Sequence, residues 1–342
     1  MVTRDDVARV AGVSSAVVSY VVNGGPRPVA ADTAERVWRA IEQLGYRPNG
    51  VARALATNRT FALAFIVPDT SNSFFATLSR YVETAAFQLG YTVLLGNTME
   101  EQQREIGYVE TFRQRGVDGF VIAPTAIPSD ALGHLAAGDD RVVLIDRDGG
   151  RQDISRVLVA NEDGGYIATK HLLEHGHTRI ACLLGPIDVN NTRMRGRGWQ
   201  RALVEAGEST DGLFIHTDVS REQAYHGTLE LLDRTPTPTA IFTTADEQAL
   251  GVYRAARERG VRIPDDIALV SFDSADTAPY LNPGLTAVGQ PLRQMAELAV
   301  QRLVGQFKDP KVTCDVLPVE LVTRGSCGCV EPTVTVRSQI SA

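Results

Sequence analysis

The 342-residue sequence lacks an apolar run that approaches the roughly 20 residues needed to cross a bilayer, so we expect no transmembrane segment. Its N-terminus also lacks an apolar stretch of the signal-peptide type, which predicts a cytoplasmic protein. Only four cysteines occur, and the close pair Cys327 and Cys329 has no second such couple, as zinc sites usually have. We therefore expect no bound metal, no cofactor and, in the cytoplasm, no structural disulfide.

The motifs of the common doubly wound enzymes are missing as well. No GxGxxG follows the strand-like segment 62–67, and no GxxxxGK[ST] loop or GxSxG elbow occurs anywhere. His171 and His175 have the i, i+4 spacing of a helical metal pair, but no third ligand is evident, and helix C-termini favour histidine in any case. The sequence thus predicts no catalytic residues and a binding protein rather than an enzyme.

Charge is unevenly distributed along the chain. The net charge is −7, which by itself argues against a nucleic-acid partner. Residues 1–60, however, hold eight arginines and five acidic residues, a balance of +3 that leaves −10 for the rest. A mildly basic head on an acidic body allows only the head to approach phosphates.

The head is predicted to contain three short helices. Thr3 and Asp6 have the spacing of an N-terminal capping pair, and Gly12 allows a sharp turn before Ser14, which can cap a second helix. Two short helices joined by such a turn form a helix-turn-helix, and a third amphipathic helix over 31–45 would close a small core. The apolar residues expected on the inner faces of the three helices are Val7, Ala8, Val10, Ala11, Val17, Val18, Val21, Val22, Val37, Trp38, Ile41 and Leu44.

A family resemblance begins in this head. The motifs AGVS, VVN, GYRPN and VARAL occur in order up to residue 55, and in them the chain resembles the lactose-repressor (LacI/GalR) family of bacterial transcription regulators. The motifs VPDTSNSFF, RGRGW, IPDDIALVSFD and LPVELVTRGSC extend the resemblance to about residue 328. It implies a DNA-binding head, a hinge helix, two periplasmic-binding-protein-like lobes and a homodimer on a pseudo-palindromic operator.

The sequence after residue 61 predicts an α/β fold. Apolar runs of strand length alternate with helices of about twelve to sixteen residues, which is the pattern of doubly wound parallel sheets. The chain is long enough for two such sheets after residue 61. The strand candidates are 62–67, 92–96, 119–123, 141–146, 180–185, 240–244 and 267–272, with a helix over 164–175.

These patterns and the resemblance together predict the domain boundaries. The helix-turn-helix head would span 1–48, and the hinge helix and linker 49–60. One lobe would combine 61–161 with 291–320, and the other 162–290 with 321–330. A tail over 331–342 shows no apolar heptads, so we expect no coiled-coil tetramerisation segment.

The second helix of a helix-turn-helix lies in the major groove with its early residues at the base edges. By position, Ser15, Ala16 and Tyr20 match the family's base-reading trio. None of the three is Arg or Gln, so direct readout should be modest. The candidate phosphate contacts are Ser19, Asn23, Thr33 and Asn49.

The hinge segment 50–56 is too short to be a stable helix on its own. The resemblance implies that it becomes helical when packed against its partner's hinge in the minor groove. Leu55 matches the family's apolar wedge, which inserts between base pairs and kinks the duplex. Arg53 could approach a phosphate or the narrow groove. The alternative for Leu55 is a buried linker residue.

A small molecule is expected between the lobes, because ligands of doubly wound sheets bind at the carboxyl ends of the strands. Nearly every predicted strand end carries a polar group. Carboxylates, amides, one arginine and one aromatic suit a sugar. Arg195 and Asp273 match the family's effector-binding pair, whereas Asp246 could belong to an inter-lobe network instead. The candidate effector-binding residues are Asp69, Asn72, Phe74, Asp146, Asn191, Arg195, Asp246, Asp273 and Gln290.

The sequence therefore predicts a dimeric, nucleoid-associated transcription regulator, interpreted as a repressor, whose operator affinity depends on a small sugar. A purine or another metabolite is the alternative effector, although the family's purine-responsive members carry an aromatic near the position of Val219. An effector acting as co-repressor or activator also stays open. A two-lobed sugar-binding protein with no role on DNA is a further alternative, which the attached head opposes.

Overall fold

The structure is a computed structural model that describes residues 2–23, 28–47, 54, 59–125, 130–138 and 140–330. The chain divides into two compact units, Met1–Ala62 with Gly116–Asp118, and the remainder. We describe each by itself. Among the described residues, no helix is both long and apolar enough to cross a membrane.

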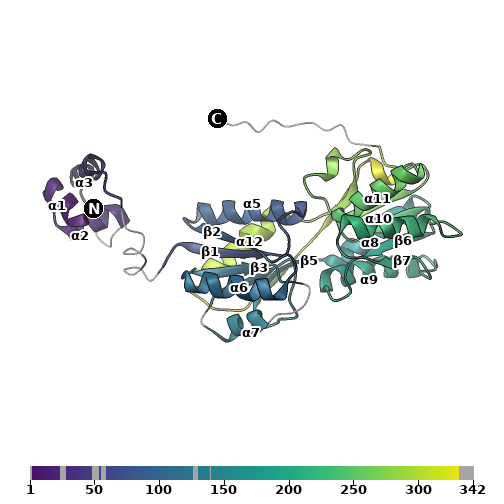
Figure 1. Cartoon of the computed structure of the whole chain (residues 1–342), viewed down its shortest axis with the longest axis horizontal. Coiled ribbons are helices and arrows are strands. Elements are labelled where there is room, and N and C mark those ends of the chain that lie inside the picture. The colour runs from purple at the N-terminus through teal and green to yellow at the C-terminus, as the bar shows by residue number, and fades with distance from the viewer. Residues whose placement is uncertain are drawn as a thin grey trace. The chain divides into compact units, whose positions relative to one another are not determined.

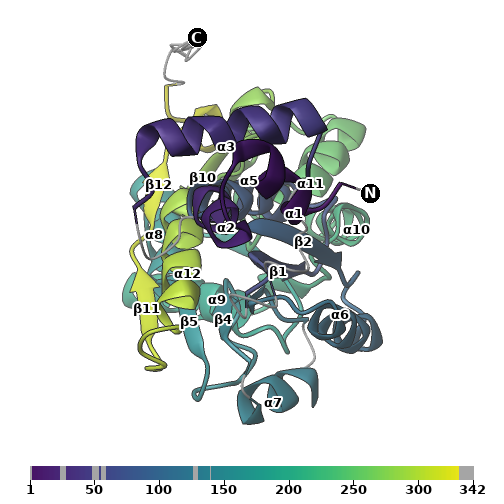
Figure 2. The same ribbon diagram turned by 90° about the vertical axis from the view of Figure 1, so that its left-hand side faces the viewer.

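The first unit contains the three expected helices, α1 (Arg4–Ala11), α2 (Ser15–Asn23) and α3 (Ala31–Leu44), of which α3 is the longest (Figure 2). Thr3 and Asp6 form the predicted capping box. Gly12 ends α1 with a φ of 67°, a left-handed conformation that glycine adopts without strain. Ser14 Oγ accepts a hydrogen bond from the Val17 amide at 3.4 Å and so caps α2. The predicted helix-turn-helix is confirmed.

The core of this unit contains fewer residues than the sequence predicts. Trp38 is 50% exposed and Val10 is 47% exposed, so their assignment to the core is wrong. Val37 and Ala40 form the buried stripe of α3, and Trp38 lies about 100° around the helix from Val37. The buried cluster consists of Val7, Ala8, Ala11, Val18, Val37 and Ala40.

The second unit contains two six-stranded sheets (Figure 1). The first has the order β11-β5-β4-β3-β1-β2, made of β1 (Ala62–Val67), β2 (Thr92–Asn97), β3 (Gly119–Ile122), β4 (Val142–Ile145), β5 (Ser155–Val159) and β11 (Cys314–Leu317). The second has the order β12-β10-β9-β8-β6-β7, made of β6 (Ile180–Leu184), β7 (Phe214–His216), β8 (Ala240–Thr243), β9 (Ala268–Asp273), β10 (Thr286–Gly289) and β12 (Glu320–Val322). In the first, β1, β3, β4, β5 and β11 pair in parallel, and in the second only β12 pairs antiparallel, with β10.

Helices cover both sheets, as parallel strands buried on both faces require. The helices beside the first sheet are α5 (Ser73–Gln88), α6 (Gln102–Gln114), α7 (Asp130–Ala137) and α12 (Leu292–Gly305), the last of which packs against β3, β4 and β5. Those of the second are α8 (Asn161–Glu174), α9 (Asn190–Glu205), α10 (Arg221–Leu232) and α11 (Asp246–Arg259), with the short helices η1 (Ala278–Tyr280) and η2 (Gly325–Cys327). This arrangement confirms the predicted fold class.

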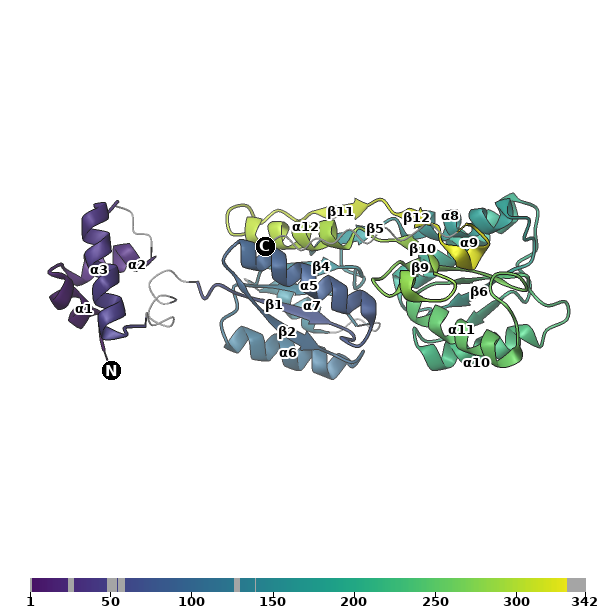
Figure 3. The ribbon, with the colours of Figure 1, turned by 90° about the horizontal axis from the view of Figure 1, so that it is seen from above.

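The chain passes between the sheets three times, after β5, after β10 and between β11 and β12 (Figure 3). The helix predicted over 164–175 begins earlier, at Asn161, directly after the first passage. Strands β7 and β11, which the sequence did not single out, lie at sheet edges, and their exposed positions interrupt the apolar run that marks a buried strand. The proposed lobe boundaries stay a prediction.

Candidate functional site

Glycines bring α8 and α9 into unusually close contact. A Cβ atom at Gly165 would overlap the main-chain carbonyl of Arg195, and one at Gly198 would overlap the carbonyl of Glu162. The helices can therefore approach backbone to backbone only because these positions have no side chain. The motifs NEDGG and RGRGW carry this contact. It places Arg195 of α9 beside Asn161, the first residue of α8.

The guanidinium of Arg195 is the centre of a buried polar network. Only 3% of the residue is exposed. Its Nε donates to Asn161 Oδ1 at 2.8 Å, and its Nη1 donates to Thr244 O at 2.8 Å and to Asp273 Oδ1 at 3.3 Å. The guanidinium carbon also lies 3.7 Å from the centroid of the Phe272 ring, within the range of a cation–π contact. These contacts hold the arginine in one orientation.

Two of the predicted aspartates have strained backbones. Asp146 directly follows β4 and has a φ of 65°, and Asp273 is the last residue of β9 and has a φ of 119°. Side chains other than glycine rarely adopt these conformations, and such strain clusters at functional sites. Both carboxylates are buried, and Arg195 Nη2 lies 4.0 Å from Asp146 Oδ1. One cation thus faces two carboxylates from different sheets.

Asp246 and Gln290 complete the network around Asp273. Gln290 Nε2 donates to Asp273 Oδ1 at 2.8 Å, and the Asp246 amide donates to Asp273 Oδ2 at 3.4 Å. Asp246 Oδ2 accepts from the Ala275 amide at 2.8 Å. Asp246 Oδ1 and Gln290 Oε1 are buried and accept no hydrogen bond of standard geometry from the described residues, although the nearby Ser271 hydroxyl helps to lower the pKa of Asp246. Two buried acceptors therefore lie beside Asp273, unsatisfied by the protein itself.

Burial dominates the electrostatics of this network. It raises the pKa of Asp273 to about 8, opposed by Arg195 and reinforced by the neighbouring Asp246 and Asp146 carboxylates. Burial also raises the pKa of Asp246 to about 6, opposed by the hydrogen bond from the Ala275 amide. The pKa of Asp146 is raised for the same reason, against the opposing charges of Arg195 and Arg147. Burial therefore favours the neutral, protonated form of these carboxyl groups.

Hydrogen bonds join the two sheets beside this network. Asn191 Nδ2, at the start of α9, donates to both oxygens of Asp146, at 3.3 and 3.4 Å. The neighbouring Asn190 Nδ2 donates to Asp148 Oδ2 at 2.9 Å. A cavity of about 250 Å³ borders these residues together with Asn161. The space next to the Arg195 network thus lies where the two sheets meet.

Three further predicted residues make local contacts. Asp69 accepts hydrogen bonds from the amide and hydroxyl of Ser71, and Asn72 caps α5 by accepting from the Phe74 amide at 2.9 Å. The buried Phe74 ring meets Phe75 edge-on, with centroids 5.0 Å apart. Among the described residues, no hydrogen bond connects Asp69, Asn72 or Phe74 to the Arg195 network.

The segment that contains Asp69, Asn72 and Phe74 nevertheless contacts a helix of the second sheet. Ser73, in the first turn of α5, donates from its amide to Glu247 Oε1 at 3.4 Å. Glu247 directly follows Asp246 at the start of α11. The start of α5 therefore lies close to the polar strand ends of the second sheet.

Sequence reasoning missed three participants. Asn161 follows β5 just as the predicted residues follow other strands, but β5 was not recognised because its burial alternates. Phe272 lies inside an apolar strand, where nothing marks it as a partner for arginine. Arg147 directly follows Asp146, and its side chain donates to Glu100 at 2.8 and 3.0 Å and to Pro124 O at 3.0 Å. The position of Arg147 just after a strand end is the sequence signal that could have identified it as a site residue.

The predicted DNA-contacting residues of the head lie on α2 and α3. Ala16 is exposed, Ser19 and Tyr20 are half-buried, and the half-buried Ser15 hydroxyl donates to Asp5 Oδ1. Thr33 Oγ1 accepts from Arg36 Nη2 at 3.4 Å. Several predicted contacts lie outside the described residues or side chains, namely the side chain of Asn23 and the residues Asn49, Arg53 and Leu55.

Both parts of the chain match known families. Residues 3–49 match "Bacterial regulatory proteins, lacI family", and residues 169–327 match "Periplasmic binding protein-like domain". The HTH-type transcriptional repressor PurR of Photobacterium profundum is 35% identical over 311 residues, which cover 90% of this chain and 93% of that protein. The name of this relative describes a transcriptional repressor.

Solved structures share the architecture of almost the whole chain. A structure titled "transcriptional regulator CelR-cellobiose complex" has 31% identity and a TM-score of 0.71, and covers 95% of this chain and 100% of the other. A Lac repressor dimer bound to operator and the anti-inducer ONPF has 28% identity and a TM-score of 0.83, with 95% and 99% covered. The neighbours include a sugar complex and an operator complex.

Proposed function

The chain belongs to the lacI family of bacterial regulatory proteins, and we propose that it is a repressor that binds operator DNA as a homodimer and responds to a small carbohydrate. The proposal combines two parts of the molecule. The head supplies the DNA-binding surface, and the network around Arg195 and Asp273 supplies the effector site. A cytoplasmic, nucleoid-associated location follows from the proposed DNA partner.

On the DNA side, α2 would enter the major groove as the second helix of the helix-turn-helix. The exposed methyl group of Ala16 suits an apolar contact such as a thymine methyl, and Tyr20 can pack against a base or bond through its hydroxyl. Ser15 would exchange its bond to Asp5 for one to DNA. The +3 balance of residues 1–60 attracts the phosphate backbone.

The proposal of a sugar effector rests on the unsatisfied buried acceptors beside Asp273. Asp246 Oδ1 and Gln290 Oε1 need donors, and adjacent sugar hydroxyls supply several donors in a small volume. The cellobiose complex of a structural neighbour is consistent with such a ligand. A purine is the alternative effector, and its ring N–H groups could satisfy fewer acceptors at once. Asp69, Asn72 and Phe74 would form the part of the site contributed by the first sheet.

The effector would act by changing how the two sheets meet. Asn191 with Asp146, and Asn190 with Asp148, bridge the sheets beside the proposed site. A sugar that binds one arrangement of these bridges more tightly shifts the population toward it. If the effector is an inducer, that shift would separate the paired hinges and release the operator. The opposite sense, with effector as co-repressor, follows from the same linkage.

Dimerisation would proceed through the body. Strand β2 lies at the edge of the first sheet, with Leu95 48% exposed. Beside it runs an open groove of about 670 Å³ that includes Val93, Tyr108 and Phe112. An exposed apolar edge of this kind suits a second copy of the chain. A dimer also doubles the phosphates that a short head can neutralise.

Two measurements test the proposal. Gel-shift assays with genomic fragments should yield a retained fragment whose site is pseudo-palindromic, and sedimentation should show a dimer. A thermal-shift screen of sugars, sugar phosphates and nucleobases should then raise the melting temperature for a sugar, which should also alter the gel shift. Stabilisation by a nucleobase alone would favour the purine alternative, and the absence of any retained fragment would refute the repressor function.

A further inference from the structure

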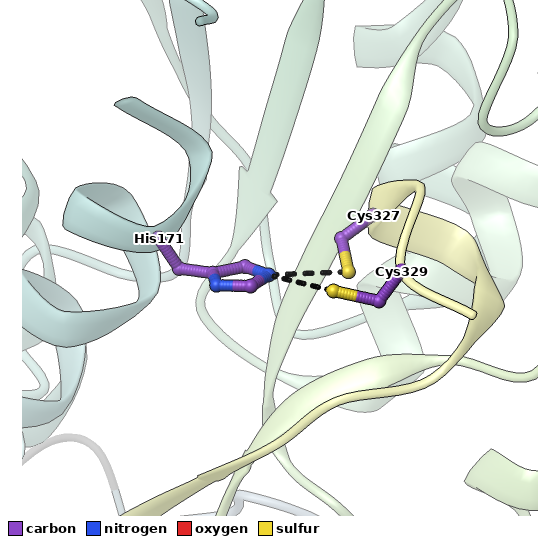
Figure 4. A group of neighbouring side chains, drawn as sticks. All are labelled: His171, Cys327 and Cys329. Carbon is purple, nitrogen blue, oxygen red and sulfur yellow. Dashed lines mark hydrogen bonds between the residues drawn. The ribbon is translucent and has the colours of Figure 1, made fainter. Parts of the chain in front are cut away.

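Two histidines and two cysteines lie together at the end of α8. His171 is in the last turn of α8 and His175 is its C-terminal cap, while Cys327 ends η2 and Cys329 follows shortly after it. Figure 4 shows the His171 ring pointing at both sulfur atoms. Asn161, which contacts Arg195, lies at the other end of α8, about 15 Å away along the helix axis. The cluster is therefore separate from the candidate effector site.

The distances among His171, Cys327 and Cys329 are those of ligands around one metal ion, and His175 lies outside this group of three, next to Cys329. His171 Nε2 lies 3.2 Å from Cys327 Sγ and 3.6 Å from Cys329 Sγ, and His175 Nε2 lies 3.4 Å from Cys329 Sγ. A zinc ion about 2.3 Å from sulfur and about 2.0 Å from nitrogen, in tetrahedral geometry, separates such ligands by about 3.5 Å. The ligand atoms of His171, Cys327 and Cys329 all lie within 4.8 Å of one another.

Hydrogen bonds alone account poorly for this convergence. The Nε2 atom of His171 carries either one hydrogen or one lone pair, yet two sulfur atoms face it. Thiols are weak donors and weak acceptors, so they gain little from sharing one ring nitrogen. A central cation instead bonds to every one of these atoms. His175 is exposed at the rim, which leaves a route for an ion from solvent.

The cysteine segment is firmly anchored. Ser326 Oγ donates to Leu269 O at 2.6 Å and accepts from the Thr286 amide at 2.8 Å. The Thr286 hydroxyl lies 2.9 Å from Arg324 O and 3.1 Å from Cys327 Sγ, so these contacts hold the start of the cysteine segment against β10. Gly328 has a φ of 93°, and this turn allows the flanking cysteines to face the same helix. The ligand positions are thus set by the fold rather than by a flexible tail.

The sequence-based expectation of no metal treated the histidine pair and the cysteine pair separately. Each pair alone lacks the remaining ligands of a zinc site. The fold brings the pairs together across 156 residues of sequence between His171 and Cys327. The end of α8 thus places a histidine couple beside the cysteine couple, and whether a metal binds there stays a prediction.

We propose that His171, His175, Cys327 and Cys329 bind one Zn²⁺ ion that links the segment after β12 to the end of α8. Two thiolates and two imidazoles in tetrahedral arrangement suit zinc among the common divalent ions. Binding displaces the thiol protons to solvent and leaves the four positions filled by protein atoms. Such a closed site is structural, and it would stabilise the lobe built on the second sheet.

The test uses the untagged full-length chain, purified under reducing conditions after growth with added zinc. Elemental analysis after dialysis should find one zinc per chain. Replacement by Co²⁺ should produce the intense visible bands of tetrahedral cobalt and a thiolate-to-cobalt charge-transfer band. A chelator should lower the melting temperature, and added zinc should restore it.

The exposed His175 and the half-buried Cys329 offer variants that leave the core intact. Cys329→Ser and His175→Gln should each lose stoichiometric zinc and the response of the melting temperature to chelator. Cys314→Ser is the matched control, because this exposed thiol lies on β11 outside the cluster and should leave zinc content unchanged. Equal zinc content in wild type and Cys329→Ser would overturn the proposal. So would weak octahedral cobalt bands, or a Cys327–Cys329 disulfide in the protein isolated without reductant.

Discussion

The main-chain carbonyl of Arg195 occupies the position that a side chain on residue 165 would need, so Gly165 and Arg195 touch backbone to backbone. This contact fixes how far α9 stands from α8. It therefore also sets where the Arg195 guanidinium reaches Asp273, at 3.3 Å, and Asn161, at 2.8 Å. A position without a side chain thus governs the geometry of a charged site.

Gly165→Ala should displace α9 and destabilise the protein by about 1–3 kcal/mol, as overpacking of a tight contact does. Because the displacement moves Arg195, sugar binding should weaken as well. Urea unfolding and calorimetry measure the two effects. Gly133→Ala is the control, since a Cβ there, within α7, meets only Arg151 Nη1 at an ordinary contact distance of 3.6 Å and should stabilise by about 0.5–1 kcal/mol. Equal stabilities of the two variants would contradict the close contact.

Arg195→Ala and Asp273→Asn should abolish the response to sugar and leave operator binding near wild type. Loss of one partner of a buried, charged hydrogen bond costs about 2–5 kcal/mol, or about 30-fold to several-thousand-fold in affinity. The variants should therefore repress permanently. Arg197→Ala, an exposed change on the same helix, should behave as wild type. Normal sugar affinity in both buried variants would place the pocket elsewhere.

Leu55→Ala should reduce operator affinity while sugar binding and the melting temperature stay unchanged. The prediction follows from the family resemblance, since Leu55 lies outside the described residues. Without its apolar wedge the protein cannot hold the kink, and the contacts that the bend permits are lost. Gel mobility of circularly permuted fragments reports the bend angle. If the mutant bends DNA as the wild type does, Leu55 is linker packing only.

The stability of the ligand-free protein should depend on pH through Asp273. Its pKa is raised to about 8 in the fold, chiefly by burial, so the native state retains a proton that the unfolded chain has lost. That contribution is complete below the unfolded pKa of about 3.9 and disappears as the pH rises through about 8. The free energy of unfolding should fall over this interval, and less steeply in Asp273→Asn. Parallel profiles for the two proteins, measured by urea unfolding, would exclude this role.

The local elements could be predicted from sequence because their signals are local. Thr3 and Asp6 lie three residues apart, and the apolar runs of β1 and β9 are contiguous, so capping and buried strands are visible in short windows. Ligands of doubly wound sheets bind at the carboxyl ends of the strands, and this rule predicts Asp146, Asp246 and Asp273 as site residues from the sequence. Trp38 was misplaced because helical periodicity identifies a face only to within about one position.

Only the tertiary structure decided which of these groups meet. Arg195 and Asp273 are separated by 78 residues, and their contact depends on the glycine-mediated approach of α8 and α9. The same holds for His171 and Cys327, whose pairing follows from the return of the chain through β12 to the second sheet. Sequence patterns encode the period of one helix or strand, whereas these distances depend on packing between elements. The sequence thus determined the fold class and the chemistry available at the strand ends, and packing selected the partners.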